Sequence, residues 1–261
     1  MAAKLSYATY LKVEDLLSLQ EPRSAGAQED RAILLSEHFF IVSHQTCELW
    51  LKQILADLAA VEAAFETMSP GGMERAVDLL YRVNDLLRLL YEQLVTLERL
   101  PLEDFARFRQ HLGTASGAQS AQFHLLEGVI GDARVDGSLY EALVVGLERT
   151  GGDLEKAARA GVEAGSVHRI IEGMLAVGNN YFRWKIGHVS LVSKMLGEQR
   201  GTADTSGTAY LMDRATLPFA RLRELRGTAH ELPDEPKPQC DVVTDGSAHR
   251  LEDVATPPNG L

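Results

Sequence analysis

Apolar and polar positions recur with a helical period along most of the chain. Within residues 181–196, apolar or aromatic side chains return every three or four positions, a spacing that puts them on one face of an α-helix. That face consists of Tyr181, Trp184, His188, Leu191, Val192 and Met195. A second stripe of this kind, within a long helix predicted over residues 30–66, consists of Phe40, His44, Cys47 and Leu51. Each stripe therefore carries one histidine among apolar side chains.

A third long helix is predicted over residues 74–100, after a turn at residues 68–73. Its apolar positions form a broad face typical of a bundle core, to which we assign no cofactor role. That face consists of Val77, Leu80, Tyr81, Val83, Leu86, Leu87, Leu90, Tyr91 and Leu94. The pattern also predicts a helix from about Ala118, two short helices within residues 136–164, a long helix from Ser166 to Gly197, and a final pair within residues 208–225.

The positions of the prolines support a helical fold. After Pro22 the next prolines are Pro70 and Pro101, and then none occurs until Pro218, so three long intervals lack the strongest helix breaker. Ala, Leu, Glu and Arg fill these intervals and favour helix. We predict an all-α helical bundle with a single domain at residues 1–226, which includes an N-terminal arm at residues 1–20. Residues 227–261, with many prolines and few large apolar side chains, are predicted to form a flexible tail.

Charge and composition exclude several classes of function. The formal net charge is −11 and no basic block occurs, so we expect no nucleic-acid partner. No apolar run approaches the roughly 20 residues of a membrane span, and no signal-peptide core is seen at the start, so we expect a cytoplasmic protein without membrane contact. The two cysteines, Cys47 and Cys240, encode neither a disulfide framework nor a thiolate metal cluster.

Several polar residues are candidates for chemistry, each with a structural alternative. His188 precedes a Gly-, Thr-, Asp- and Ser-rich run, and so is either the ligand of a flat, metal-centred apolar cofactor or a core histidine bonded to a carbonyl. Arg109 shares a face with aromatic rings and needs an anion, either a ligand carboxylate or a protein carboxylate. Tyr7 and Tyr10 either cap an apolar pocket or pack within the arm. Glu48, one turn after His44, is a candidate to orient that imidazole.

Four blocks of the sequence resemble the tryptophan 2,3-dioxygenases, a family of histidine-ligated haem enzymes. In chain order they read YATYLKVEDLLSLQ, EHFFIVSHQTCELWLKQ, FARFRQHLGTASGAQSAQF and GHVSLVSKMLGEQRGTADTSGTAYL. The resemblance covers most of the chain, from Tyr7 to about Leu225. It implies an all-α bundle with one haem pocket per subunit, haem b as cofactor, O2 as co-substrate and an indole amino acid as substrate.

The resemblance also implies roles for individual residues. His188 would be the axial ligand of the haem iron, with Trp184 and Val192 on the porphyrin face. His44 would face the indole nitrogen as the distal, catalytic histidine. The substrate would be bound by Phe40, Phe105, Arg109, Ser116 and Thr202. Tyr7 and Tyr10 would cap the pocket of a neighbouring subunit, which implies a homo-oligomer, either a tetramer or a dimer.

Three departures from the family pattern widen the range of expected functions. The loop reads GTADTSG where the family usually has GTGGSSG, Phe105 stands where relatives often have a tyrosine, and Gly187 replaces an arginine before the axial histidine. The expected reaction is dioxygenation of the indole C2–C3 bond to an N-formylkynurenine. The alternatives are a monooxygenase of secondary metabolism that gives an oxindole or hydroxyindole, a non-catalytic haem- or indole-binding protein, and a helical oligomerisation module without cofactor.

Overall fold

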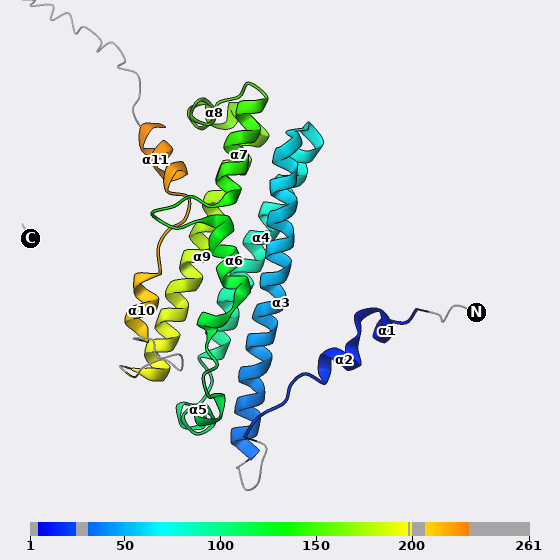
Figure 1. Ribbon diagram of the computed structural model, residues 1–261, viewed down its shortest axis with the longest axis vertical. Helices are drawn as coiled ribbons and strands as arrows, with labels where there is room; N and C mark the ends of the chain where they lie inside the picture. Colours follow the sequence, from blue (N-terminus) through cyan, green and yellow to red (C-terminus); the bar gives the residue numbers. More distant parts are fainter. Residues whose placement is uncertain (1–4, 25–30, 198, 200–206, 230–261) are drawn as a thin grey trace, which may run out of the picture. The chain divides into compact units, whose positions relative to one another are not determined.

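Three long helices, α3, α4 and α9, lie side by side at the centre of the fold (Figure 1). The computed structural model describes residues 5–24, 31–197, 199 and 207–229. Helix α3 spans Arg31–Thr67, α4 spans Pro70–Leu97 and α9 spans Ser166–Leu196. Helix α4 packs against both of the others, and α6 and α7 cover α3. All of these helices belong to one compact unit formed by residues 1–230.

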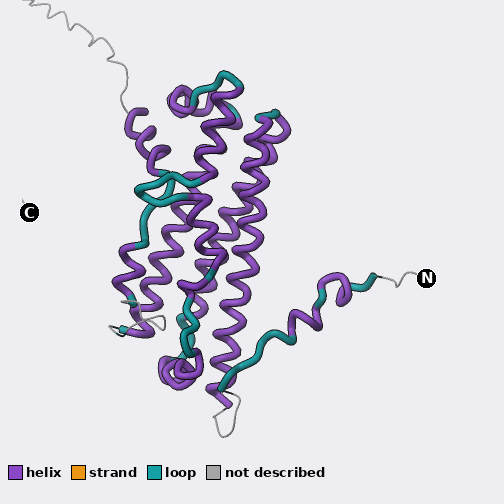
Figure 2. The backbone as a smooth tube through the Cα atoms, viewed as in Figure 1, coloured by secondary structure: helices purple, strands orange, loops and turns teal. Residues whose placement is uncertain are grey.

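Shorter helices complete the described part of the chain, which contains no β-strand (Figure 2). They are α1 Tyr7–Leu11, α2 Val13–Leu17, α5 Leu102–Arg109, α6 Ala121–Ile130, α7 Ser138–Arg149, α8 Leu154–Ala160, α10 Thr208–Asp213 and α11 Ala220–Ala229. Short 3-10 turns occur at Gln110–Leu112, Gly117–Gln119 and Gly161–Ala164. The prediction of an all-α fold is therefore confirmed.

The predicted bounds of α3 and α9 are correct to about one residue, but those of α4 are wrong at both ends. Helix α4 begins at Pro70, inside the predicted turn, and ends at Leu97. The hydroxyl of Ser69 accepts a hydrogen bond from the Gly72 amide at 3.2 Å, and proline at the first helical position needs no amide hydrogen. This cap draws the two glycines of the expected turn into the helix.

The core lies where α3, α4, α7 and α9 meet. Its fully buried side chains recur at helical spacing along each helix. Examples are Leu51, Ile54, Leu58, Val61 and Phe65 of α3, Leu80, Val83, Leu87 and Leu90 of α4, and Ile170, Met174 and Val177 of α9. Two members of the predicted α4 core face are not part of this core, because Tyr81 and Tyr91 are exposed.

Hydrogen bonds attach the base of the N-terminal arm to α3 at two places. Gln20 donates to Gln45 Oε1 at 2.6 Å, and Gln45 Nε2 donates to the Leu19 carbonyl oxygen at 2.9 Å. The buried carboxylate of Glu37 accepts hydrogen bonds from the backbone amides of Arg23 and Ser24 and from the Ser24 hydroxyl. Beyond this base, α1 and α2 contain no buried residue. The predicted tail at residues 227–261 lies almost wholly outside the described residues, so the domain bounds remain predictions.

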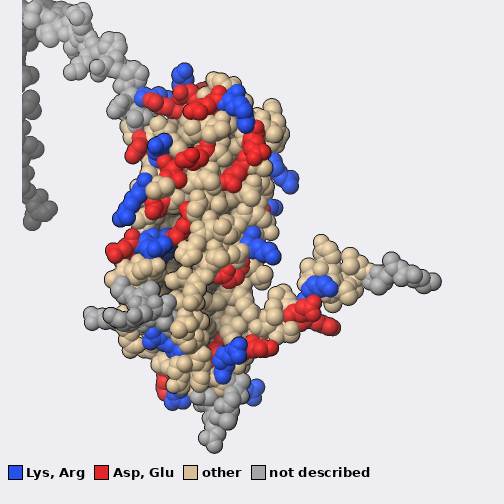
Figure 3. Space-filling model, in the orientation of Figure 1, with Lys and Arg blue, Asp and Glu red and all other residues tan. Residues whose placement is uncertain are grey.

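Acidic and basic side chains are interspersed over the face of the molecule in Figure 3. No extended basic surface appears there among the described residues. Within the described part of the chain, no helix has the length and hydropathy to cross a bilayer.

Candidate haem and substrate site

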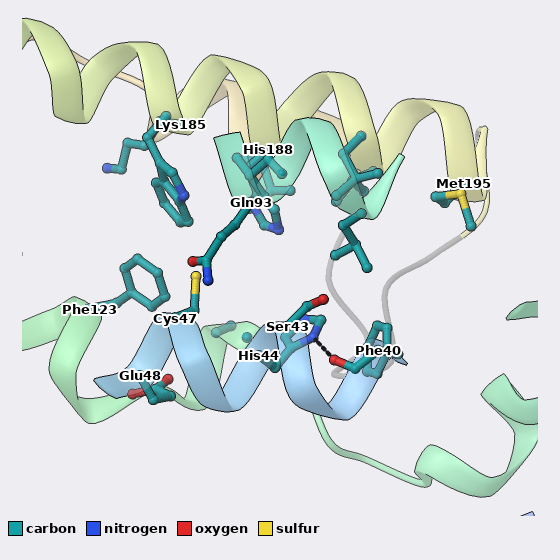
Figure 4. Close-up of a pocket in the computed structure, with 18 of the residues that line it drawn as sticks. Phe40, Ser43, His44, Cys47, Glu48, Gln93, Phe123, Lys185, His188 and Met195 are labelled. Atoms are coloured by element: carbon teal, nitrogen blue, oxygen red, sulfur yellow. Dashed lines mark hydrogen bonds between the residues drawn. The ribbon is translucent and has the colours of Figure 1, made fainter. Parts of the chain in front are cut away.

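A cavity of about 290 Å³ lies between α3, α4 and α9, closed at its sides by parts of α5, α6 and α10 (Figure 4). His188 points into it from α9, and His44 points toward it from α3 on the opposite wall. Most of the remaining lining is apolar. It includes Phe40, Cys47, Leu94, Leu97, Phe105, Phe123, Trp184, Leu191, Val192, Met195 and Leu196. The two histidine-bearing stripes predicted from sequence therefore face one another across a single cavity.

The His188 imidazole is held by an aromatic stack. The Trp184 ring lies one turn earlier on α9, 5.5 Å from the His188 ring between centroids and tilted by only 9°. Phe123 of α6 stacks near Trp184 with a centroid distance of 4.7 Å. Burial, together with the charge of His44, lowers the pKa of His188 to about 4. His188 is therefore neutral at neutral pH, and none of the causes of its shift is a hydrogen bond to a described residue.

His44 is oriented by the backbone of its own helix. Its Nδ1 lies 2.8 Å from the Phe40 carbonyl oxygen, and its ring packs on the Phe40 ring with a centroid distance of 4.0 Å. Because a carbonyl can only accept, Nδ1 carries the proton and Nε2 is left with a lone pair. Burial lowers the pKa of His44, so the neutral form dominates near neutral pH. His44 as a residue is exposed, and it is part of the cavity lining.

Glu48 does not orient His44 through a hydrogen bond. Its carboxylate accepts a hydrogen bond from Gln122 Nε2 at 2.6 Å, and the same amide nitrogen donates to the Glu48 carbonyl. Glu48 affects His44 only through its charge, which raises the pKa of His44 against the effect of burial.

Phenylalanines close the cavity beside His44. Phe40 lies 6.0 Å from Phe105 and 5.5 Å from Phe108 between ring centroids. Phe105 and Phe108 meet edge to face at 5.4 Å. The wall formed by α5 thus offers rings and no hydroxyl, an environment suited to a flat aromatic ligand.

The other described residues that were predicted for the site lie outside this cavity lining. Arg109 donates to Gln199 Oε1 at 3.0 Å, which links the end of α5 to the segment after α9. The Ser116 hydroxyl accepts from the Ala118 amide and caps the turn at Gly117–Gln119, whose first two residues do line the cavity. Tyr7 and Tyr10 are 77% and 69% exposed on the arm. Thr202 lies outside the described residues.

The sequence analysis missed the contribution of α4 and α6 to the cavity. Gln93, Leu94 and Leu97 line it from α4, whose face we had assigned wholly to bundle core, and Phe123 and Glu127 line it from α6. A signal was present for Gln93, because this amide interrupts the apolar stripe formed by Leu90, Leu94 and Leu97. No periodic signal marks Phe123, which reaches the cavity only through the packing of α6 on α3.

Comparison with known proteins assigns the chain to a family. A family model described as tryptophan 2,3-dioxygenase matches residues 1–142. A tryptophan 2,3-dioxygenase of Nocardioides sp. is 32% identical over 88% of this chain and 96% of its own length, and one of Rhodococcus jostii is 29% identical over 83% and 88%. One of Xenopus tropicalis is 40% identical over 49% of this chain and 31% of its own length. The chain belongs to the tryptophan 2,3-dioxygenase family.

The cavity of this tryptophan 2,3-dioxygenase family member fits a haem. No cluster of three or more His, Cys, Asp or Glu side chains with metal-binding geometry occurs among the described residues. An iron ion at His188 therefore needs a cofactor that brings its other ligands, as a porphyrin does. The neutral imidazole, the apolar walls and the Trp184 stack match these needs. Three buried polar atoms of the lining, Gln93 Oε1, Tyr181 Oη and Trp184 Nε1, also have no partner within the described structure.

Proposed function

We propose that the chain is a haem-dependent oxygenase that uses O2 to cleave the indole C2–C3 bond of L-tryptophan or a substituted tryptophan. The observation that carries this proposal is the pair of neutral imidazoles, His188 and His44, on opposite walls of one apolar cavity. In dioxygenation both atoms of O2 enter the product, the C2–C3 bond breaks and two carbonyl groups form. The product is then an N-formylkynurenine, and no external reductant is consumed in the net reaction.

The residues of α9 would hold the cofactor. His188 would ligate the haem iron through its neutral imidazole, with Trp184 and Val192 against the porphyrin face. The bound haem would supply the chemistry that activates O2. Family membership, the apolar lining and the absence of another multidentate metal site among the described residues support haem b as this cofactor.

The residues of α3 and α5 would bind and orient the substrate. Nε2 of His44 is the free acceptor and would take a hydrogen bond from the indole N–H. Phe40 and Phe105 would pack on the indole ring and exclude water from the reacting edge. Arg109, at the end of α5, would hold the substrate carboxylate, and Ser116 and Thr202 would contact its polar end.

Isotope labelling and two histidine variants test this function. Reduced, haem-loaded protein supplied with L-tryptophan and 18O2 should give a ring-opened product with two labelled atoms. A product with one labelled atom and an intact ring would replace dioxygenation by monooxygenation. His188→Ala should abolish the spectrum of histidine-ligated haem, whereas His168→Ala, a matched change elsewhere on α9, should retain it. An unchanged spectrum for His188→Ala would refute the ligand assignment.

We also propose that the chain forms a homo-oligomer in which the arm covers the cavity of a neighbouring subunit. The arm exposes a set of large apolar and aromatic side chains, and exposed sets of this kind mark surfaces that contact another protein. They are Leu5, Tyr7, Tyr10, Leu11 and Leu17. Subunit mixing tests this arrangement. Tyr7→Ala/Tyr10→Ala chains and His188→Ala chains should each be weakly active, and mixed oligomers should regain activity in sites that combine an intact haem ligand with an intact arm. Mixtures no more active than the separate variants would exclude capping between subunits.

A further inference from the structure

One end of the cavity is charged. Lys185 Nζ lies 2.7 Å from Glu127 Oε1, and Arg214 Nη2 lies 3.4 Å from Glu127 Oε2. Lys185 also donates to the Arg214 carbonyl at 2.7 Å, and all three side chains line the cavity. Lys185 and Arg214 thus share the carboxylate of Glu127 beside a mostly apolar space, and the charge of Lys185 also acts on Asp132, outside the cavity lining.

The same end holds a hydroxyl without a partner. Tyr181 Oη is buried and makes no hydrogen bond to any described residue. The centroid of the Tyr181 ring lies 5.0 Å from Lys185 Nζ. Burial raises the pKa of the Tyr181 phenol most, the charge of Glu127 raises it further, and the charge of Arg214 lowers it. A buried hydroxyl without a partner destabilises the site unless a ligand accepts its hydrogen bond. The ligand group that suits an ammonium, a guanidinium and a hydroxyl donor together is a carboxylate.

Two carboxylates could reach the cavity, one from a haem propionate and one from an amino-acid substrate. Figure 4 shows Lys185 and Phe123 at one end of the cavity, Met195 and Phe40 at the other, and His188 between them. Arg109 follows Phe105 and Phe108 on α5 and thus belongs to the Phe40 end. Lys185 precedes His188 by three residues on the same helix, at the edge of any ring that His188 ligates. The position of the charged end therefore favours the propionate.

The residue directly before the axial histidine cannot supply this charge. A Cβ atom at Gly187 would lie 2.9 Å from Tyr91 Cε2 and 3.5 Å from Leu94 Cδ1, so position 187 faces α4. A longer side chain there would meet the Tyr91 ring before it reached the charged end. The cation must come from another position, and Lys185, whose side chain is only 15% exposed, is in place.

We propose that Lys185 and Arg214, with the hydroxyl of Tyr181, bind the propionate carboxylates of the haem in competition with the carboxylate of Glu127. This assignment rests on the proposed ligation of haem by His188. Lys185 is the principal contact, because its side chain is 15% exposed and that of Arg214 is 45% exposed.

Porphyrins with and without free propionates test the proposal. The apoprotein and its variants are titrated with haem and with haem dimethyl ester, and binding is followed by the Soret absorbance. Lys185→Met, which keeps the aliphatic stem over Tyr181, should weaken haem binding about tenfold and leave binding of the ester unchanged. Lys185→Arg should restore most of the haem affinity, because a guanidinium also binds a carboxylate.

Glu127→Gln is the matched control that separates a ligand-binding role from a structural ion pair. It breaks the same pair but leaves both cations free, so haem affinity should stay equal or rise. If Glu127→Gln and Lys185→Met weaken haem and ester alike, the pair is structural and the proposal is wrong. Urea unfolding of each apoprotein identifies any variant that fails to fold. If Lys185→Met fails to fold, the haem and ester affinities of Lys185→Arg are compared with those of the wild type instead.

A substrate titration separates the two sources of carboxylate. Haem-loaded Lys185→Met should bind L-tryptophan and tryptamine, which lacks the carboxylate, in the same ratio as the wild type. A selective loss of L-tryptophan binding with unchanged haem affinity would assign Lys185 to the substrate and overturn the proposal. Failure of the wild type to bind haem through histidine would instead overturn the proposed function itself, an outcome visible before any variant is made.

Discussion

Trp184 offers the sharpest test of how the fold holds the imidazole of His188, the proposed axial ligand. Its side chain is 6% exposed and lies between the rings of Phe123 and His188, nearly parallel to the latter. The Tyr181 ring also stacks near Trp184, at 6.2 Å between centroids. Trp184→Leu removes all three ring contacts, whereas Trp184→Phe keeps a ring in the stack. The pair of variants therefore separates loss of volume and burial from loss of aromatic stacking.

The expected magnitudes follow from this packing. Truncation of a buried Trp to Ala costs about 3–5 kcal/mol, and Leu refills part of the space, so Trp184→Leu should lower the free energy of unfolding of the apoprotein by about 2–3 kcal/mol. Trp184→Phe should cost about 1 kcal/mol, because it also removes an indole N–H that is buried without a partner in the described structure. Urea unfolding, followed by circular dichroism, measures both values.

The consequence for the haem is measured by transfer of haem to an excess of apomyoglobin. In Trp184→Leu the His188 ring is free to rotate about its side-chain bonds, so haem should dissociate about tenfold faster than from Trp184→Phe. The reasoning is refuted if Trp184→Leu loses the expected stability and yet releases haem at the same rate as Trp184→Phe. Trp184 would then fill space in the core without positioning the ligand.

Three further predictions concern the rest of the fold. Glu37→Gln should lower the free energy of unfolding by about 1–3 kcal/mol at pH 7. Burial raises the pKa of Glu37, but hydrogen bonds from Ser24 and Arg23 outweigh burial and lower the pKa overall. The stability difference between Glu37→Gln and wild type should therefore shrink as the pH falls below 4.5, which urea midpoints measured across pH would show. Burial raises the pKa of Cys47 to about 12, so in a background without the second cysteine its alkylation at pH 8 should be about a thousandfold slower than in denatured protein, measured by mass spectrometry. Gly146→Ala should destabilise the protein by about 1–3 kcal/mol, since its Cβ would lie 2.5 Å from the Phe65 carbonyl oxygen. Gly128→Ala, whose Cβ would meet nothing within 4 Å, should stabilise the protein by about 0.5–1 kcal/mol, and thermal unfolding of both variants measures the difference.

The long helices and their histidines could be predicted from the sequence because both depend on local spacing. A 3.6-residue period fixes which side chains share a face, and it put His44 and His188 on apolar stripes before any tertiary contact was known. The error at α4 has the same local origin. Ser69 and Pro70 form a helix start, but the two glycines after them were interpreted as a turn.

The rest of the cavity could not be predicted because it depends on contacts between distant residues. Lys185 and Glu127 are 58 positions apart, and nothing in the period of α6 or α9 indicates that they meet. The period also overstated the core, since Tyr81 and Tyr91 fit the apolar stripe of α4 but lie at its exposed edge. Periodicity identifies the side of a helix that is apolar, whereas packing decides how far around the helix burial extends.

His44 and His188 lie on different helices, so a change in packing can affect the surroundings of one imidazole and leave those of the other unchanged. Lys185, His188 and Met195 all belong to α9, which is pressed against α4 at Gly173, where a Cβ would lie 3.1 Å from the Leu80 Cβ atom. Any shift of α9 therefore moves His188, the proposed axial ligand, together with the charged end of the cavity. His44 belongs to α3, which reaches α9 largely through α4. If His44 binds the substrate and α9 holds the haem, as proposed, changes in the packing of α3 on α4 should alter substrate binding and leave haem binding intact.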